Sequence, residues 1–328
     1  MAKKRLVSGM RTTGSLHLGH LEGTLKNWVS LQDEYDCFFF AAVWHAFTDR
    51  LKIEDLPEVI DEMIVDWLSV GIDPERSVIF RQSAMHEHAE LCTILCNMTP
   101  LGWLERCPTF KDEVRDDEAR SRVSLGKLMY PVLQTADIAA YKGEVVPVGK
   151  DQIPHLELSR EIIRRFNGQY GEILLEPEAR LSAVPMLLGI DKRKMSKSYD
   201  NGIYLRETAE SLKQKIQMMI TDPQRVKRND PGDPEVCTVY AYHKIYTSDR
   251  LEEIGQGCRT AGIGCRDCKM ILFDRLNQML EPMRQKRAEI EARPGYIKEV
   301  LAAGEEKAHR IAGQTIDEIR KAMGFLSR

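Results

Sequence analysis

Short apolar runs alternate with amphipathic stretches in the first half of the chain, and this alternation constrains the fold more than any other feature. Apolar runs that predict buried strands lie at 5–9, 37–44, 77–80 and 144–149. Stretches with apolar residues at helical spacing lie at 56–71, 86–97, 128–141 and 152–166. Because strands alternate with helices, we expect an α/β fold class with a doubly wound, parallel, Rossmann-like sheet.

The pattern changes after residue 194. The amphipathic segments 207–220, 268–292 and 304–323 predict helices, and no convincing strand follows them. We therefore expect two domains, a Rossmann-like domain over 1–192 and an all-α C-terminal domain over 193–328. The polar stretch 100–125 is weakly patterned and is predicted to be a surface excursion.

The charge balance excludes one class of protein. The chain of 328 residues has 47 Lys and Arg against 50 Asp and Glu, a net charge of −3, so it is not a broadly basic nucleic-acid coat. A local basic patch stays possible. The longest apolar run, CFFFAAVW, is too short to cross a bilayer, and the first residues contain no apolar leader segment, so we expect a cytoplasmic protein. Eight cysteines in such a chain favour metal binding or packing over disulfides.

Two histidines lie where the first helix should begin. In GSLHLGH (14–20), His17 and His20 flank Gly19 just after the first predicted strand, and with Thr24 they lie away from the apolar stripe of the helix. In an open α/β sheet, ligands bind at the carboxyl ends of the strands. A helix N-terminus favours phosphate, and an imidazole can donate to phosphate oxygens. Solvent-exposed histidines on an ordinary helix are the competing interpretation.

A second motif lies near the predicted domain boundary. KMSKS (194–198) places Lys194 and Lys197 three residues apart among serines. Two mobile ammonium groups suit a triphosphate whose leaving group gains charge during the reaction. A solvated basic linker is the alternative for this motif taken alone.

These two motifs together resemble the signature elements of the class I aminoacyl-tRNA synthetases. The segments SGMRTTGSLHLGHLEGTLKNWVSLQ (8–32), LMYPVLQTADI (128–138) and VPVGKDQIPHLELSREI (146–162) narrow the resemblance to the tryptophanyl-tRNA synthetases. The resemblance implies activation of tryptophan by ATP, with Mg²⁺, to tryptophanyl-adenylate and pyrophosphate. Transfer of tryptophan to the 3′ end of tRNA(Trp) follows. The C-terminal domain would then comprise the KMSKS loop and an anticodon-binding region.

The resemblance also implies roles for individual residues. His17, His20, Lys194 and Lys197 would act on the phosphates in the transition state, and Gly19 would lie under the adenine–ribose end of ATP. The other residues implied in ATP binding are Arg11, Thr12, Thr13, Gly149, Lys150, Asp151, Met186, Met195, Ser196 and Ser198.

The tryptophan pocket needs an acceptor, because the indole N–H is a donor only. By resemblance, Asp137 is that acceptor, and it would reject phenylalanine because its carboxylate would then lack a partner. Tyr130 and Gln152 would hold the α-amino group, with His45, Val146, Val148 and Gln134 around the pocket. Gln134 and Val43-Trp44 depart from the commoner bacterial pattern, which puts the pocket lining in doubt.

Four C-terminal cysteines have the spacing of metal ligands. Cys237, Cys258, Cys265 and Cys268 give C-x20-C-x6-C-x2-C, which suits Zn²⁺ or a [4Fe–4S] cluster, and spacing alone does not choose between them. A subset of tryptophanyl-tRNA synthetases carries a C-terminal [4Fe–4S] site, so the resemblance favours the cluster. The pair His86 and His88 in HEH has no third ligand in sequence, and we do not predict a metal site there.

Two other functions remain open at this point. A tyrosyl-tRNA synthetase would share the fold and the Gln134 and Asp137 arrangement. A synthetase-like RNA-binding regulatory protein would share the fold without the activity, although the signature residues are intact. By resemblance we expect a homodimer, with the region 80–180 at the interface.

Overall fold

The computed structural model describes residues 3–12, 14–48, 51–114, 118, 122–181, 187–195 and 199–325. Within these residues, five parallel strands form one sheet in the order β3-β2-β1-β4-β5. The strands are β1 (Arg5–Arg11), β2 (Asp36–Ala42), β3 (Ser77–Arg81), β4 (Val145–Val148) and β5 (Glu178–Leu181). The order reverses between β1 and β4, which is the switch point where doubly wound sheets bind ligands. The expected α/β fold class is confirmed.

The apolar strands bury both faces of the sheet. Leu6 and Phe39 pack into one core with the helices α2 (Lys26–Leu31) and α4 (Leu56–Ser69). Val7 and Phe38 point into the opposite core. That second core is filled by the helices α5 (His86–Met98), α9 (Leu125–Ala139), α10 (Ile153–Tyr170) and α15 (Tyr296–Ala322). Burial on both faces explains why the strands read as continuous apolar runs rather than as alternating ones.

The first helix is interrupted. It begins as α1 (Leu18–His20), continues as the π-helical turn η1 (Leu21–Leu25) and only then becomes regular in α2. Such π-turns widen a helix locally and occur frequently at functional sites. The sequence pattern alone predicts a continuous helix here.

The remaining helices follow the predicted alternation, with some additions. Helices α4, α5, α9 and α10 confirm the predictions at 56–71, 86–97, 128–141 and 152–166. Within the predicted surface excursion over 100–125, two short helices form, α6 (Leu101–Glu105) and α7 (Pro108–Glu113). Helices of five or six residues are too short to show a period. Strand β5 was missed because all four of its residues are exposed and carry no apolar pattern.

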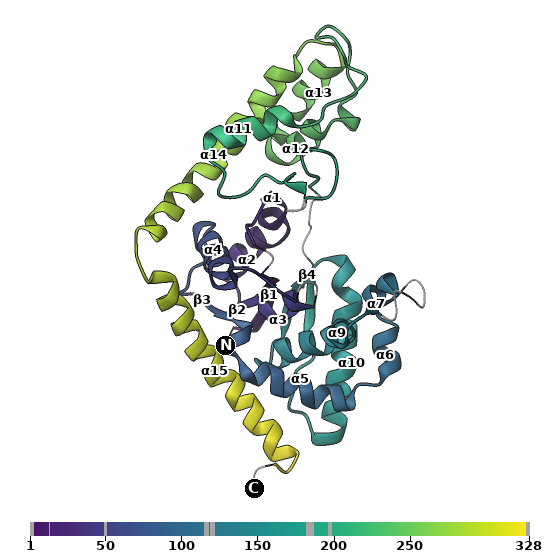
Figure 1. The fold of residues 1–328 in the computed structure, drawn as a ribbon, viewed down its shortest axis with the longest axis vertical. Helices are drawn as coiled ribbons and strands as arrows, with labels where there is room; N and C mark the ends of the chain where they lie inside the picture. The colour runs from purple at the N-terminus through teal and green to yellow at the C-terminus, as the bar shows by residue number, and fades with distance from the viewer. Residues whose placement is uncertain are drawn as a thin grey trace.

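Helices also dominate the described residues after 194. They are α11 (Ala209–Met218), α12 (Thr238–Tyr246), α13 (Leu251–Arg259), α14 (Cys265–Glu291) and α15. In Figure 1, α11, α12 and α13 form the upper part of an elongated molecule, and α14 leads down from them towards the sheet. Helix α15 then runs along the edge of the sheet beside β3 (Figure 1). The division at 192/193 stays a prediction, and the structure adds that α15 packs on the sheet-bearing part.

A glycine permits this close approach of α15. A Cβ atom added to Gly304 would lie 1.8 Å from the carbonyl oxygen of Ile79 in β3. Helix α15 therefore touches the backbone of the edge strand, which it covers against solvent.

Candidate active site

A cavity of about 690 Å³ lies at the carboxyl ends of β1, β2 and β4. Its walls come from the first helix, from His45 beyond β2 and from α9 and the turn after β4. Residues of the predicted site that line it are Arg11, His20, His45, Tyr130, Gln134, Asp137, Val146, Val148, Gly149 and Gln152. Ligand cavities are expected at this switch point of a doubly wound sheet.

Other predicted residues are not part of the cavity lining. These are Thr12, His17, Gly19, Lys150, Asp151, Lys194 and Met195. Thr12 is buried and Lys194 is exposed. Thr13, Met186, Ser196, Lys197 and Ser198 lie outside the described residues.

The histidines of HLGH cap their own helix. Nδ1 of His17 accepts a 3.1 Å hydrogen bond from the backbone N–H of Gly19, and Nδ1 of His20 accepts one of 3.2 Å from the N–H of His17. This reciprocal pair satisfies N–H groups that a helix start leaves without partners. An imidazole that accepts at Nδ1 carries its proton on Nε2 when it is neutral. The capping therefore leaves each ring with a donor N–H on the side away from the backbone.

The segment that follows KMSKS lies against the start of the first helix. The N–H of Leu18 donates to the carbonyl oxygen of Ile203 over 2.9 Å, and the N–H of Leu205 donates to the carbonyl oxygen of Leu16 over 2.9 Å. A Cβ added to Gly19 would lie 3.8 Å from the sulfur of Met195. The two motifs, remote in sequence, are neighbours in space.

Asp137 lies at the centre of a buried hydrogen-bond network. Asp137 is 1% exposed, and its carboxylate contacts His45 Nε2 at 2.8 Å and His88 Nδ1 at 2.6 Å. The amide of Gln82 donates to both oxygens over 2.8 and 2.9 Å. Burial alone would raise the pKa of Asp137, but the hydrogen bonds from His45 and His88 outweigh it and lower the pKa to about 2. The cavity thus contains an ionised, acceptor-only group.

Sequence reasoning missed the residues that hold Asp137. Gln82 comes from the 3-10 turn η2 (Gln82–Ala84), His88 from the first turn of α5, and Tyr141 contacts His88 Nε2 through its hydroxyl at 2.6 Å. The Asp137 carboxylate can only accept, so His88 donates from Nδ1, and the Tyr141 hydroxyl holds the other ring nitrogen. No spacing in the sequence links these residues, because they converge from three elements.

Tyr130 has a partner that the sequence did not suggest. Its hydroxyl lies 2.7 Å from Nε2 of His155, and Nδ1 of the same ring lies 3.1 Å from the sulfur of Cys107. Burial lowers the pKa of His155, which favours a neutral ring. Tyr130 is therefore held in place on the cavity wall by a buried imidazole.

The four C-terminal cysteines converge from three helices. Cys237 precedes α12, Cys258 lies near the end of α13, and Cys265 and Cys268 lie in the first turn of α14. Burial first, and then the three neighbouring thiols, raise the pKa of Cys268 to about 12. His243 Nε2 lies 3.3 Å from the Cys268 sulfur. Of the described residues, no three of these sulfurs have all their separations within 4.8 Å.

Comparisons with known proteins place this architecture in context. The model of the family "tRNA synthetases class I (W and Y)" matches residues 2–281. The tryptophan–tRNA ligase of Thermotoga maritima is 46% identical over 98% of this chain and 99% of its own length. That of Aquifex aeolicus is 41% identical over 98% of this chain and its whole length. The structure of the Campylobacter jejuni tryptophanyl-tRNA synthetase with ADP and tryptophan has a TM-score of 0.85, with 34% identity, and covers 98% of this chain and 99% of its own.

Among the described residues, no helix combines the length and the apolar character needed to span a membrane.

Proposed function

The chain belongs to the class I tRNA synthetases of the tryptophan and tyrosine family, and from this premise we propose how its residues carry out the work of a tryptophan–tRNA ligase. The enzyme joins tryptophan to ATP, with release of pyrophosphate, and then transfers tryptophan to tRNA. Similarity to tryptophan–tRNA ligases over nearly the whole length of both chains carries the choice of tryptophan over tyrosine. The family model covers both tryptophan and tyrosine enzymes, so it does not distinguish the tyrosyl alternative.

We propose that Asp137 accepts the indole N–H. A carboxylate offers about four acceptor positions, and His45, His88 and the Gln82 amide make four contacts with its two oxygens. The last bond, to the indole N–H, is therefore made by a donor that shares one of these positions. A buried ionised acceptor loses this last bond when the side chain of the substrate has no donor, so it discriminates against phenylalanine. Val146 and Val148 line the same cavity and supply apolar contacts to the ring. His45 and Gln134 complete the proposed lining.

The α-amino group of tryptophan is assigned to Tyr130 and Gln152. Both line the cavity. His155 holds the Tyr130 hydroxyl, and the Gln152 amide donates to Asp151 over 3.0 Å, so both side chains are positioned before substrate arrives. Preorganised polar groups orient a substrate at low entropic cost.

The phosphates are assigned to His17, His20, Lys194 and Lys197. The attack of a carboxylate on the α-phosphate needs positioning and charge stabilisation rather than covalent help. Imidazole Nε2–H groups next to a helix N-terminus suit the developing negative charge. The lysines suit the leaving pyrophosphate, and Mg²⁺ carried in with ATP supplies further positive charge there. The backbone contacts of Leu18 with Ile203 support the view that both motifs act on one triphosphate.

The nucleoside end of ATP is assigned to the turn after β4 and to the first loop. Gly149 lines the cavity, where a Cβ would collide with Asp151 Oδ1 at 2.6 Å, so the turn is closed tightly. The remaining contacts are proposed for Arg11, Thr12, Thr13, Gly19, Lys150, Asp151, Met186, Met195, Ser196 and Ser198.

For the four cysteines we propose a [4Fe–4S] cluster. Four thiolates suit either Zn²⁺ or a cluster, and the resemblance to tryptophanyl-tRNA synthetases that carry a C-terminal [4Fe–4S] site supports the cluster. Cys237, Cys258, Cys265 and Cys268 would be its ligands, and the cluster would supply a structural cross-link between α12, α13 and α14. Arg225 supports this arrangement, since its guanidinium donates to the Ile263 carbonyl over 2.7 Å and lies 3.8 Å from the Cys258 sulfur.

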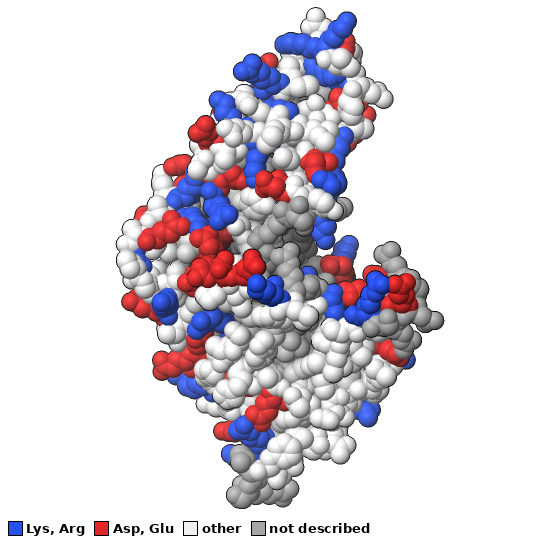
Figure 2. Space-filling model, in the orientation of Figure 1, with Lys and Arg blue, Asp and Glu red and all other residues white. Residues whose placement is uncertain are grey.

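The surface around these cysteines suits RNA. Exposed basic side chains there are Lys227, Arg228, Arg259 and Arg266. Figure 2 shows Lys and Arg side chains at the upper end of the molecule, over α13 and the beginning of α14. Because the phosphate backbone dominates affinity for nucleic acids, we propose that tRNA(Trp) is bound on this side. We further propose that the protein is a homodimer with residues 80–180 at its interface. Its proposed location is cytoplasmic, where aminoacylated tRNA is used.

Pyrophosphate exchange tests the function directly. The protein should incorporate labelled pyrophosphate into ATP when tryptophan is present, and tyrosine should not replace it. Exchange driven by tyrosine alone would overturn the substrate assignment. Binding of tRNA without any exchange would instead indicate a regulatory protein.

A further inference from the structure

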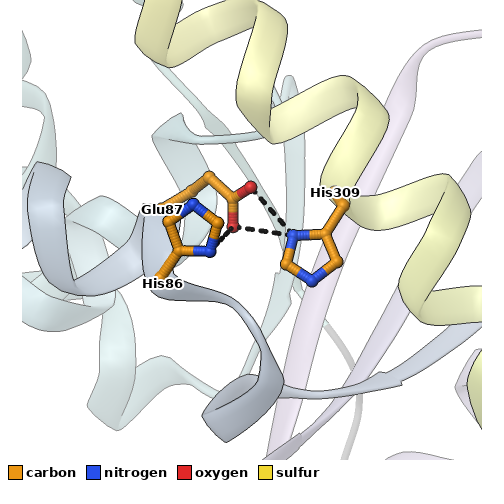
Figure 3. Close-up of side chains that lie close together, drawn as sticks. All are labelled: His86, Glu87 and His309. Atoms are coloured by element: carbon orange, nitrogen blue, oxygen red, sulfur yellow. Dashed lines mark hydrogen bonds and ion pairs between the residues drawn. The ribbon is translucent and has the colours of Figure 1, made fainter.

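Three potential metal ligands meet outside the active site. His86 and Glu87 begin α5, and His309 comes from the middle of α15 (Figure 3). Each offers one donor atom within 4.8 Å of the other two. His309 Nδ1 lies 2.8 Å from Glu87 Oε1, and His86 Nδ1 lies 3.7 Å from Glu87 Oε2. The two imidazole rings face the same carboxylate from opposite helices, with centroids 5.4 Å apart.

Glu87 differs from the other acidic groups at this helix contact. Glu305 of α15 is paired with Arg81, and Glu90 of α5 is paired with Arg320, both through two hydrogen bonds. The side chain of Glu87 is only 5% exposed, and two imidazoles face it. Arginine always carries its charge, whereas imidazole does not. A buried carboxylate needs a compensating cation. The two side chains that face this carboxylate are imidazoles, a type of side chain that commonly binds metal ions.

We propose that His86, Glu87 and His309 bind one divalent transition-metal ion, with Zn²⁺ as the best-suited example. Two imidazole nitrogens and a carboxylate oxygen form a known zinc donor set, and a fourth position stays with water. A tetrahedral ion about 2.0–2.1 Å from each donor separates the donors by about 3.3 Å. Measured to the same oxygen, Glu87 Oε2, His309 Nδ1 lies at 3.1 Å and His86 Nδ1 at 3.7 Å, which bracket this value, so binding needs only small side-chain movements.

The chemistry of binding follows from the present hydrogen bonds. The proton that His309 shares with Glu87 at Nδ1 must leave, because the metal takes the lone pair of that nitrogen. His86 is 75% exposed, which gives an ion a path to the site. Gly313, one turn further along α15, has no side chain, and even an added Cβ there would lie 4.0 Å from Glu87 Oε1. Gly313 therefore does not block the site.

The site would join two distant parts of the chain. The third ligand comes from α15, which lies on the edge strand β3, and the first two come from the segment directly after β3. The metal would therefore hold the C-terminal helix to the sheet. HEH in the sequence suggested His88 as a partner of His86, but His88 points to Asp137, and only the fold brings His309 to its place.

Calorimetric titration with Zn²⁺ tests the proposal on the full chain with its cysteine site left intact. The variants are His309→Gln, whose amide can still donate to Glu87, and His86→Gln, which changes an exposed side chain. Arg310→Gln, next to His309 and exposed, is the matched control. The wild type and Arg310→Gln should bind one more Zn²⁺ per chain than either histidine variant. If a histidine variant still binds this ion, its affinity should be more than about tenfold lower.

A second measurement separates this site from the cysteines. Bound Co²⁺ should show the weak visible bands of nitrogen and oxygen ligands in the wild type, and these bands should be absent from both histidine variants. The absorption of whatever group the four cysteines hold should be the same in all three proteins. Equal Zn²⁺ stoichiometry and affinity in the wild type and both histidine variants would overturn the proposal. Thermal melting of each variant checks that it is folded. If His309→Gln is unfolded, the comparison rests on His86→Gln.

Discussion

The backbone N–H of Leu18 donates a 2.9 Å hydrogen bond to the carbonyl oxygen of Ile203. This bond joins the start of the first helix to the chain just beyond KMSKS, and the bond from Leu205 to the Leu16 carbonyl repeats the connection. The capping histidines therefore lie on a backbone that the segment after the second motif helps to hold. Movement of this segment relative to the first helix must break or bend these bonds.

Changing His20 to Ala should slow adenylate formation far more than it weakens tryptophan binding. The ring is assigned to charge on the phosphates, where loss of one donor typically costs about 10²–10³ in rate. Pre-steady-state adenylate formation gives the rate, and quenching of protein fluorescence gives tryptophan affinity. Equal losses in both would mean that His20 serves the helix cap alone.

Changing Asp137 to Asn should remove discrimination for the indole N–H. The wild type should prefer tryptophan to its benzothiophene analogue, which has no N–H donor, by roughly 10- to 100-fold in kcat/KM. The variant should treat the two nearly alike, because its neutral amide no longer provides an ionised acceptor. A preference that survives the substitution would place the acceptor elsewhere in the cavity.

The same carboxylate should contribute to stability in a defined pH range. Its folded pKa of about 2 lies below its ordinary value of 3.8, so the ionised form stabilises the fold. This contribution, roughly 2 kcal/mol, is complete above pH 4 and is lost as the pH falls towards 2. Urea unfolding midpoints between pH 5 and 3 should therefore fall less steeply in Asp137→Asn than in the wild type. Parallel curves would contradict the depressed pKa.

Changing Cys265 to Ser should remove iron and sulfide from protein purified without oxygen. Tryptophan-dependent pyrophosphate exchange should persist, since the cavity lies at the sheet, whereas aminoacylation of tRNA should fall. Cys96→Ser, in α5 and away from this site, is the control and should retain both activities. Wild-type protein that contains one zinc and no sulfide would decide for the zinc alternative.

Changing Gly304 to Ala should destabilise the protein by about 3 kcal/mol or more. The new Cβ would overlap the Ile79 carbonyl oxygen, so α15 must move off the edge strand. Gly313→Ala in the same helix is the control, and without such an overlap it should gain about 0.5–1 kcal/mol from helix propensity. Denaturant unfolding measures both, and similar values for the two variants would show that α15 adapts without cost.

The sequence predicted some elements of the site better than others. The strands β1 to β4 and the helices α4, α5, α9 and α10 were predicted because apolar periodicity is a property of each segment alone. Strand β5 and the short helices α6 and α7 carry no such period. Asp137 was predicted as an acceptor from resemblance, and its burial agrees with that, but its role remains a prediction.

By itself the sequence determined the α/β class, the two motifs and the spacing of the four cysteines, because these are patterns along the chain. Only the tertiary structure decided which side chains hold Asp137 and which histidine faces His86. Gln82, His88 and Tyr141 come from separate elements, and His309 reaches Glu87 only because α15 folds back over β3. Contacts between distant segments depend on packing, and no local pattern encodes them.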